Sequence, residues 1–297
     1  MSTPETPNHD VAENSADTEA SCQYEKNCYT TPSQNYSRNL VKYDKALVRS
    51  ILDDGYLCHV GFIAPPRDIG ITEKKHCPGG EPVVLPMLYG RVGETLYLHG
   101  SPDSRLMTTV RNCSPEGYPV CVTVTHVDAL VLGFSVFGTV ISYRSAVIHG
   151  NAKYLDEKNG KEEKGRALRA LLNQVVPGRS ETSRPPTPDE LDKPTVIRID
   201  IRDASAKIRT GGADENPMDI GDNRYWAGVL PVRQVYGPPI SALNIGPGVS
   251  VPDHIKYLTE IREHRNIQML PPEDSNGSNR DTPKTGHGGG QRGSMSR

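Results

Sequence analysis

The sequence predicts an α+β fold: an antiparallel split β-barrel with small flanking helices. Several short segments alternate apolar and polar residues, as half-buried antiparallel strands do. A few other short segments carry apolar residues at helical spacing. No repeat of fixed period is present, which excludes solenoids and propellers. Short strands with small helices between them therefore favour a closed or split barrel.

The predicted barrel begins with a helix over Tyr43–Gly55. Asp44 can cap its first turn, and Gly55 stands where a C-cap glycine is common. The strand patterns that follow cover Tyr56–Ile63, Pro82–Tyr89 and Thr95–Leu98. The stretch Ala64–Gly80 between the first two strands is rich in Pro and Gly, so we expect a surface excursion there.

The second half of the chain continues the strand pattern. Val120, Val122 and Val124 alternate with residues of mixed polarity, which predicts a half-buried strand. The strands expected here are Val120–Thr125, Asp128–Ser135, Tyr143–Ala152, Thr195–Ile201 and Trp226–Val235. Helices are expected over Lys161–Val176 and Pro252–His264, and loops over Arg179–Lys193 and Ala204–Asn223.

Composition predicts one folded domain between two tails. The mean hydropathy is −0.55, and 28 Gly and 25 Pro are too many for a chain that is folded throughout. Residues 1–35 contain almost no aliphatic side chains, and residues 265–297 are rich in Gly, Ser and Arg. We expect disorder in both tails and a barrel domain with a C-terminal extension over residues 36–264.

Charge patterning excludes several classes of partner. The net charge is −2 and no long Lys/Arg tract is present, so we expect no nucleic-acid binding. No apolar run reaches the roughly 20 residues that a membrane helix needs. Residues 1–20 are acidic and polar, unlike a secretory signal. We therefore expect a cytoplasmic protein without membrane association.

The six cysteines have neither the spacing of a disulfide framework nor that of a zinc knuckle. Cys58-His59 and His76-Cys77 could in principle supply four ligands for a tetrahedral metal site. Adjacent residues of a strand point to opposite faces, however, so Cys58 and His59 cannot readily share one ion. We expect reduced thiols and no metal site.

The segment Leu96–Arg105 resembles a phosphate-binding turn. A strand pattern ends at His99-Gly100-Ser101, and Ser101 and Ser104 are candidate N-caps for a helix that begins at Arg105. A helix N-terminus offers unpaired N–H groups, and Arg105 can bind phosphate oxygens. The alternative is a capped surface helix without a ligand, which the segment by itself does not exclude.

An ordered set of segments resembles a known family. These segments are Cys58-His59-Val60-Gly61-Phe62, Val84-Leu85-Pro86, Leu96–Ser101 with Ser104-Arg105, Val120–Thr125, Tyr143-Arg144-Ser145, Pro177-Gly178-Arg179, Ala204–Arg209 and Trp226–Pro231. In this order they resemble the pyridoxamine-5′-phosphate-oxidase-like FMN split-barrel superfamily, close to its nitroimidazole-reductase type. The resemblance covers about Tyr36–Val235.

The resemblance implies a homodimer with FMN held in clefts between the subunits. It implies that Val84, Leu85 and Pro86 lie beside the flavin, that His99, Gly100, Ser101, Ser104 and Arg105 take the ribityl phosphate, and that Tyr143, Arg144 and Ser145 face the ring system. Lys207 and Arg209, in a predicted loop, would reach the polar edge of the cofactor or the dimer seam, or be solvated. Trp226 would flank the isoalloxazine or fill the end of the barrel.

Some positions depart from the family pattern. Relatives often carry paired His residues where this chain has Gly138-Thr139-Val140, so proton transfer by such a pair is not expected. The second basic phosphate ligand of true pyridoxamine-phosphate oxidases falls at Leu106, which cannot bind an anion. Arg262-Glu263-His264 has the spacing of their substrate segment but lies in a helix-like run. We therefore expect that the protein is not a true pyridoxamine-phosphate oxidase.

Two functions remain open from the sequence. The first is an FMN-dependent oxidoreductase that passes electrons from a nicotinamide donor to a small organic acceptor, with the flavin carrying the chemistry. No catalytic residue is assigned: His99 is the one candidate proton donor, but the sequence favours the alternative that it is a hydrogen-bonded turn residue. The second is a non-catalytic module that binds or senses FMN or haem. A barrel that binds no flavin and acts through its surface is a further alternative.

Overall fold

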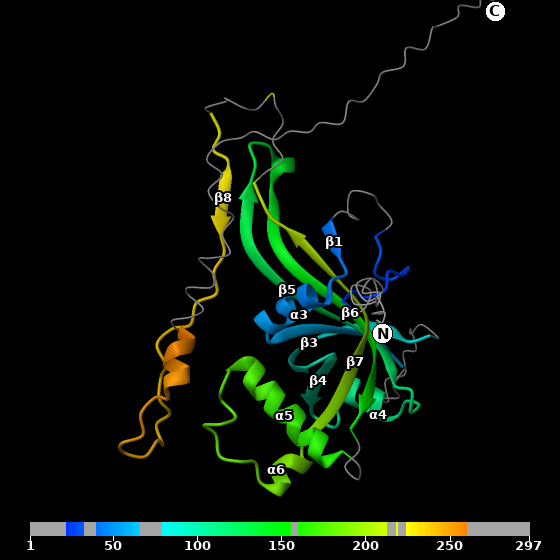
Figure 1. Ribbon diagram of the computed structural model, residues 1–297, viewed down its shortest axis with the longest axis vertical. Coiled ribbons are helices and arrows are strands. Elements are labelled where there is room, and N and C mark those ends of the chain that lie inside the picture. Colours follow the sequence, from blue (N-terminus) through cyan, green and yellow to red (C-terminus); the bar gives the residue numbers. More distant parts are fainter. Residues whose placement is uncertain are drawn as a thin grey trace, which may run out of the picture.

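A ring of antiparallel strands forms the centre of the structure, a computed structural model that describes residues 22–32, 40–65, 79–155, 160–212, 218 and 224–259 (Figure 1). The strands are β1 (Val41–Lys42), β2 (Leu57–Ala64), β3 (Glu81–Val92), β4 (Thr95–Gly100), β5 (Tyr118–Leu132), β6 (Val140–Tyr154), β7 (Thr195–Arg209) and β8 (Gly228–Pro231). They pair in the order β7-β4-β3-β2-β5-β6, and a β6–β7 pairing closes the ring. β1 extends the sheet at β7, and β8 pairs with β5. The predicted α+β antiparallel barrel is confirmed.

The helices attach to this ring at defined places. They are α3 (Lys45–Asp54), α4 (Arg105–Arg111), the 3-10 turn η1 (Val136–Gly138), α5 (Lys161–Val175), α6 (Pro188–Asp192) and a turn of helix at residues 253–259. α3 begins at the predicted cap, because the Asp44 side chain accepts a hydrogen bond of 2.7 Å from the N–H of Leu47. Among the residues that the structure describes, no helix is long and apolar enough to span a membrane.

The core lies inside the ring, where strand residues alternate between the two faces. β2 buries Cys58, Val60 and Phe62, and β5 buries Val120, Val122 and Val124. The apolar faces of α3 and α4 pack into the same cluster. α5 covers the outside of β3 and β4, where a second, smaller cluster of buried residues forms.

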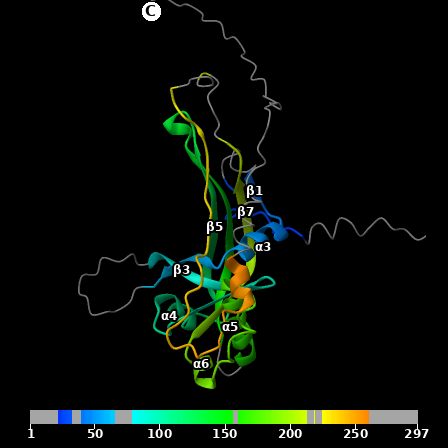
Figure 2. The ribbon, with the colours of Figure 1, turned by 90° about the vertical axis from the view of Figure 1, so that its left-hand side faces the viewer.

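β5 and β6 form a long hairpin that projects beyond the barrel, with β8 running beside its outer half (Figures 1 and 2). The sequence predicts two strands here, Val120–Thr125 and Asp128–Ser135. In the structure they are one strand, because a register shift between Val127 and Ala129 absorbs the break in alternation. β8 covers only part of the predicted strand Trp226–Val235.

Other boundaries also differ from the expectation. β7 continues to Arg209 through the first part of the predicted loop Ala204–Asn223, because β6 pairs with it as far as Tyr143. A short helix, α6, lies inside the predicted loop Arg179–Lys193. The predicted N-terminal tail contains structure at residues 22–32, where Tyr24 packs into the core. Residues 66–78 of the predicted excursion and residues 260–297 lie outside the described residues.

Candidate functional site

The outward residues of β2, β3, β5 and β6 form one surface, which we call the outer sheet face. Its members are Leu57, His59, Gly61, Ile63, Val84, Pro86, Leu88, Cys121, Thr123, Thr125, Val127, Tyr143, Ser145 and Val147. The register joins them into rows, since Pro86 pairs with His59, His59 with Thr123, and Thr123 with Val147. None of the members is Asp, Glu, Lys or Arg.

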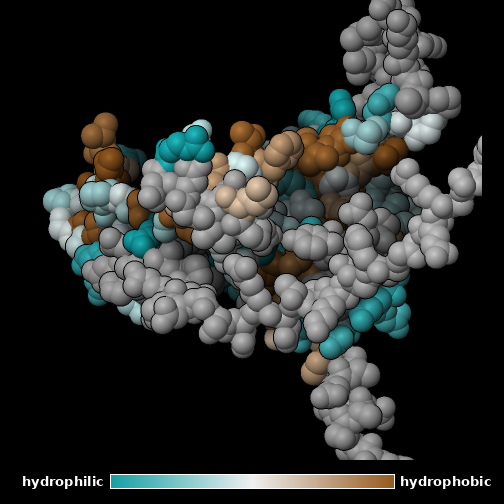
Figure 3. Space-filling view, turned by 90° about the horizontal axis from the view of Figure 1, so that it is seen from above, coloured by the Kyte–Doolittle hydropathy of each residue, from teal (hydrophilic) through white to brown (hydrophobic). Residues whose placement is uncertain are grey.

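Apolar side chains on this face are not covered by the described part of the chain. Leu57 is 47% exposed, Val84 64% and Val127 41%, although all three are on central strands of the ring. In the view from above, hydrophobic side chains gather along one edge of the molecule (Figure 3). An apolar surface of this kind marks a place where a ligand or another protein binds.

The structure brings four of the predicted flavin contacts onto the outer sheet face. Val84 and Pro86 lie there on β3, and Tyr143 and Ser145 lie there on β6. Val127 pairs with Tyr143 and links this end of the face to the cavity described below. β3 and β6 are three strand spacings, roughly 14 Å, apart, and the row of Pro86 ends at Val147 rather than at Ser145 or Tyr143. Val84 with Pro86 and Tyr143 with Ser145 therefore form two separate groups on this face.

Leu85 and Arg144 do not share that face. Successive strand residues alternate, so neither predicted triplet can place all of its side chains on one side. Leu85 packs against the core. Arg144 makes ion pairs of 2.7 Å with Asp54 and 3.1 Å with Asp128 on the other side of β6. Burial opposes its charge, but the two carboxylates outweigh burial and raise its pKa. The expectation that Arg144 faces the flavin ring is wrong for the side chain as it stands.

The predicted phosphate turn has the expected local structure. The hydroxyl of Ser104 caps α4 by accepting from the N–H of Met107 at 3.4 Å. Gly100 leaves no room for a side chain without displacing Met107, whose terminal carbon would lie 3.1 Å from an added Cβ. The Arg105 side chain is exposed and has no hydrogen-bond or ion-pair partner within the described ranges. It is available to an anion.

Two residues that the sequence analysis did not single out brace this turn. Arg111 donates hydrogen bonds of 2.9 Å to the carbonyl of Pro102 and 3.2 Å to the hydroxyl of Thr195. Thr195 pairs with Gly100 across the β4–β7 ladder. Arg111 is the last residue of α4, and an Arg near a helix end is not by itself a specific signal in the sequence. These contacts depend on the pairing of β4 with β7, which brings Thr195 next to Gly100, and the local sequence does not reveal that pairing.

The turn begins beside the outer sheet face. The pairing between β3 and β4 ends at Tyr89–Leu98. His99 is the next residue of β4, and it lies on the same side of the sheet as the exposed Leu88. The His99 side chain is exposed, yet partial desolvation lowers its pKa, which favours the neutral ring at pH 7. His99 therefore connects the edge of the outer sheet face to the turn.

Lys207 and Arg209 lie on a strand, which corrects the expectation of a loop. They pair with Ser145 and Tyr143, and the hydroxyl of Ser145 donates to the carbonyl of Lys207 at 3.4 Å. Trp226 is 69% exposed, so it does not fill the end of the barrel. It precedes the pair Gly228–Leu132, toward the tip of the hairpin and away from Val84 and Pro86.

A cavity of about 930 Å³ opens next to Val127. Its walls come from the end of α3, from β3, β5 and α5, and from the C-terminal segment; among them are Asp54, Asp128, Arg144, Gln174, Arg233 and His254. A volume of this size is in the range of small-molecule sites.

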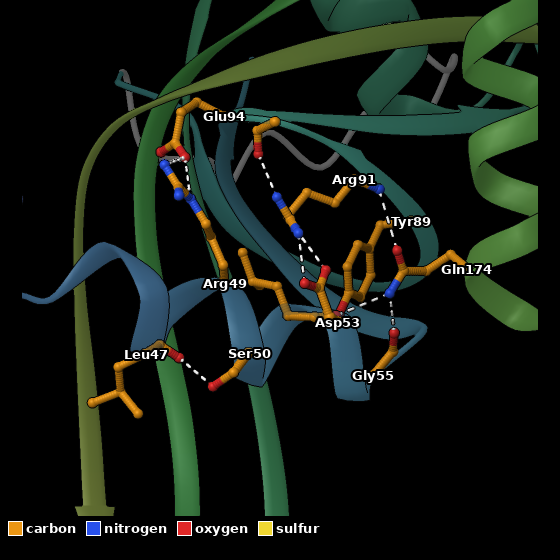
Figure 4. A network of polar contacts seen from close by, with 11 residues as sticks. Leu47, Arg49, Ser50, Asp53, Gly55, Tyr89, Arg91, Glu94 and Gln174 are labelled. Carbon is orange, nitrogen blue, oxygen red and sulfur yellow. Dashed lines mark hydrogen bonds and ion pairs between the residues drawn. The ribbon is translucent and has the colours of Figure 1, made fainter. Parts of the chain in front are cut away.

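The floor of the cavity is a network of satisfied polar groups (Figure 4). Arg91 binds Asp53 through two hydrogen bonds of 2.7 and 2.5 Å. The side-chain amide of Gln174 donates to the carbonyls of Leu52, at 2.9 Å, and Gly55, at 2.6 Å. The network joins α3, β3 and α5, so it fixes the position of the end of α3 relative to the ring.

One imidazole nitrogen is buried without a partner. Nε2 of His149 has no hydrogen bond among the described residues, and the ring lies 5.9 Å from that of Tyr29. His149 pairs with Cys121 across the β5–β6 ladder. Burial lowers the pKa of His149, so the ring is neutral at pH 7 and able to accept a bond at this nitrogen.

The metal site weighed from the sequence combined Cys58-His59 with His76-Cys77, and the second pair lies outside the described residues. Cys58 is buried and His59 is exposed, on opposite faces of β2, as strand geometry requires. Burial raises the pKa of the Cys58 thiol to about 12, so it is a thiol and not a thiolate at pH 7.

Comparisons with known proteins agree with this geometry. A family model described as pyridoxamine 5′-phosphate oxidase matches residues 44–208. No curated protein sequence matches the chain. The FAD and haem binding protein from Mycobacterium smegmatis is 29% identical, with a TM-score of 0.62 over 74% of this chain and 97% of its own. The flavocytochrome Anf3 from Azotobacter vinelandii is 30% identical, with a TM-score of 0.61 over 77% of this chain and 95% of its own.

A candidate 5-nitroimidazole antibiotic resistance protein from Bacteroides thetaiotaomicron is 22% identical, with a TM-score of 0.43 over 57% of this chain and 86% of its own. The family model matches more than half of the chain, within the ring of strands that carries the outer sheet face. The chain belongs to the pyridoxamine 5′-phosphate oxidase-like family of split-barrel proteins.

Proposed function

We propose that this protein binds a flavin on the outer sheet face and transfers electrons through it. One observation carries the proposal: Val84 with Pro86, and Tyr143 with Ser145, lie on the same uncharged, exposed sheet surface. The turn at Arg105 offers an exposed guanidinium that has no partner among the described residues. An apolar surface beside a cation suits a ring system that carries a phosphate.

The flavin we propose is FAD. The sequence suggests FMN, and both molecules offer a phosphate to the turn at Ser104 and Arg105. The M. smegmatis protein, which matches 74% of this chain, binds FAD, and this favours the larger cofactor. We further propose a homodimer, because the exposed apolar side chains of the outer sheet face need a cover that the flavin alone does not provide.

The residues of this chain would have separate tasks. A bound flavin supplies hydride and electron transfer. Arg105 neutralises its phosphate, while Val84 and Pro86 exclude water from one side of the ring. His99, neutral because desolvation lowers its pKa, can accept a proton near the phosphate end. The electron donor we propose is a nicotinamide, and the acceptor is a small organic molecule.

The first test is the visible spectrum of the purified protein, with the ligand released by heat and identified by mass. We expect a yellow protein that releases FAD. Release of FMN would keep the site and change the cofactor, and a colourless protein that refuses both flavins would overturn the proposal. Anaerobic reduction by NADH or NADPH, followed by reoxidation with a nitro compound or a quinone, would then establish turnover. Failure with both donors would leave a binding module.

The second test concerns Arg105. Removal of a charge-assisted phosphate contact costs about 1.5–3 kcal/mol, so Arg105→Ala should weaken flavin binding by roughly 10- to 150-fold. Arg169→Ala on α5 is the matched control, since Arg169 is also exposed and lies away from the turn. Titration of the apoproteins with flavin, followed by fluorescence, gives both dissociation constants. Equal affinities for the two variants would exclude Arg105 from the site.

A second cofactor is supported by the buried nitrogen of His149. The M. smegmatis protein binds haem as well as FAD, and the A. vinelandii protein is a flavocytochrome. A neutral imidazole with an unpartnered, buried Nε2 fits the role of an axial ligand. We propose that this chain also binds haem, with His149 holding the iron.

The haem proposal has its own readout. Reconstitution with haemin should give a Soret band in the wild-type protein, and His149→Gln should abolish or shift it while flavin content stays unchanged. His59→Gln is the matched control, because His59 is exposed on the outer sheet face. A Soret band that is unaffected by His149→Gln would place the haem elsewhere.

A further inference from the structure

One long segment of the chain carries no charge. Between Arg233 and Asp253 there is no Asp, Glu, Lys or Arg, although 24% of the whole chain is charged. We call residues 234–252 the apolar loop. Its large side chains are exposed: Val235 is 63% exposed, Ile240 97%, Leu243 107% and Val249 65%.

Hydrogen bonds attach the apolar loop to other described parts of its own subunit near its two ends. Before it, the N–H of Val232 donates to the carbonyl of Asp128 at 2.9 Å. Gln234, its first residue, donates to the hydroxyl of Tyr56 at 2.7 Å. After it, His254 lies 3.3 Å from the hydroxyl of Thr182. Figure 1 shows this yellow and orange part of the chain beside the barrel, on the left.

The loop has no regular secondary structure between β8 and the helical turn at residues 253–259. Large apolar side chains on an extended, uncharged segment cost solvation free energy unless another surface covers them. The described part of the same chain does not cover them, because the exposed fractions of Ile240 and Leu243 are near complete.

The outer sheet face has the matching character. It is also exposed, apolar and without Asp, Glu, Lys or Arg. When two uncharged surfaces pack together, no charge is buried. A charged partner would lose the hydration of its charges when it packed on either surface, which is unfavourable. Both surfaces belong to one chain, and neither covers the other within that chain. In a two-fold symmetric dimer, each chain can cover the exposed surface of its partner.

We propose that the apolar loop of one copy covers the outer sheet face of a second copy and forms a wall of its flavin site. This inference rests on the proposed flavin site and homodimer, and adds the segment that completes each site. About nine extended residues lead from each anchor to the middle of the loop, a reach of roughly 30 Å. Ile240 and Leu243 lie in that middle part and would contact the partner.

The test is a pair of variants at fully exposed positions. Ile240→Asp with Leu243→Asp puts charge on the loop without disturbing the subunit's own core, since neither side chain is buried. We expect a fall from dimer to monomer mass in light scattering and at least tenfold weaker flavin binding. Ile240→Leu with Leu243→Ile keeps size and polarity, and should behave as the wild type.

Subunit mixing separates contact with the partner from contact within one chain. One chain carries the two Asp substitutions, and the other carries Arg105→Ala in its own phosphate turn. If the loop acts on the partner, the mixture regains flavin binding, because the intact turn of the first chain meets the intact loop of the second. If the loop acts only on its own subunit, no intact site forms and binding stays low.

The outcomes distinguish this inference from the flavin proposal. A wild-type dimer that binds flavin, with both properties unchanged by the Asp substitutions, overturns the loop contact and leaves the flavin site standing. A wild-type dimer without flavin overturns the flavin proposal, and the mass of the Asp variant still tests the loop. A wild-type monomer, with or without flavin, overturns the loop contact.

Discussion

Glu94, in the turn between β3 and β4, joins three segments of the chain. Its carboxylate accepts a hydrogen bond from the hydroxyl of Tyr24. It also accepts one of 2.5 Å from the guanidinium of Arg49 (Figure 4). Burial alone would raise the pKa of Glu94, but these bonds outweigh it and lower the pKa. A lowered folded-state pKa stabilises the protein above the ordinary carboxyl value of 4.5, and this contribution is lost as the pH falls through the folded-state pKa.

Glu94→Gln should therefore lower the free energy of unfolding at pH 7, and the difference from the wild type should shrink as the pH falls from about 5 to 3. Urea unfolding curves at several pH values measure this directly. Glu25→Gln is the control, because Glu25 is exposed. A stability difference that does not vary with pH would show that the ionisation of Glu94 is not its source.

Arg144 is the centre of an ion-pair network on the inner side of β6. Its side chain is 16% exposed and balances two carboxylates, those of Asp54 and Asp128. Arg144→Met should cost about 3 kcal/mol, because it removes the Arg144 counter-ion from two partly buried carboxylates. Thermal unfolding measures the loss, and adding Asp54→Asn to Arg144→Met should recover part of it. No recovery would mean that packing of the long Arg stem, rather than its charge, provides the stabilisation.

The sequence predicts the roles of some of these residues and not those of others. The cap at Asp44 and the cap at Ser104 were predictable, since each depends on a few neighbouring residues. The side that each member of Tyr143-Arg144-Ser145 faces follows from strand alternation, but the resemblance treats the three as one group. The bracing of the phosphate turn by Arg111 depends on Thr195, 84 residues away, and no local pattern reveals it.

At the level of elements, α5 packs directly on β3 at Gly90. A Cβ at this position would lie 2.4 Å from the backbone nitrogen of Leu171, so no side chain fits without moving the helix. Gly90→Ala should destabilise the protein by about 1–3 kcal/mol through overpacking. Gly165→Ala, within α5 where the nearest atom would be 3.7 Å away, should be neutral or stabilising. Chemical unfolding of both variants checks the pair, and equal effects would contradict the close approach of α5.

Element boundaries differ from the prediction where pairing overrides local composition. Polar residues in Ala204–Arg209 indicate a loop, yet β6 offers hydrogen-bond partners along the whole segment and β7 continues. The bulge in β5 likewise joins two predicted strands into one. In both cases the deciding neighbour is the β5–β6 hairpin, whose length is not visible in any single window of sequence.

At the scale of the whole molecule, the outer sheet face and the hairpin leave more apolar surface exposed than a solitary barrel requires. Leu130, Ile141 and Leu230 continue this surface up the hairpin and onto β8, and Phe137 at its tip is 97% exposed. Large exposed patches of this kind mark interfaces. A second copy can cover the same patch on both chains through a two-fold axis.

Leu57→Lys tests this assembly, because Leu57 lies opposite Leu88 in the middle of the outer sheet face and is 47% exposed. The subunit itself should stay folded, since the new charge points to solvent, while the copy that covers the outer sheet face would have to bury a lysine. We expect a monomer by light scattering, an unchanged circular dichroism spectrum and at least tenfold weaker flavin binding, because each cleft then lacks its second wall. Leu57→Ile, which keeps the surface apolar, should remain a dimer. A Leu57→Lys variant that stays dimeric would place the interface on another surface, and one that is monomeric yet binds flavin normally would show that a single subunit supplies the whole site.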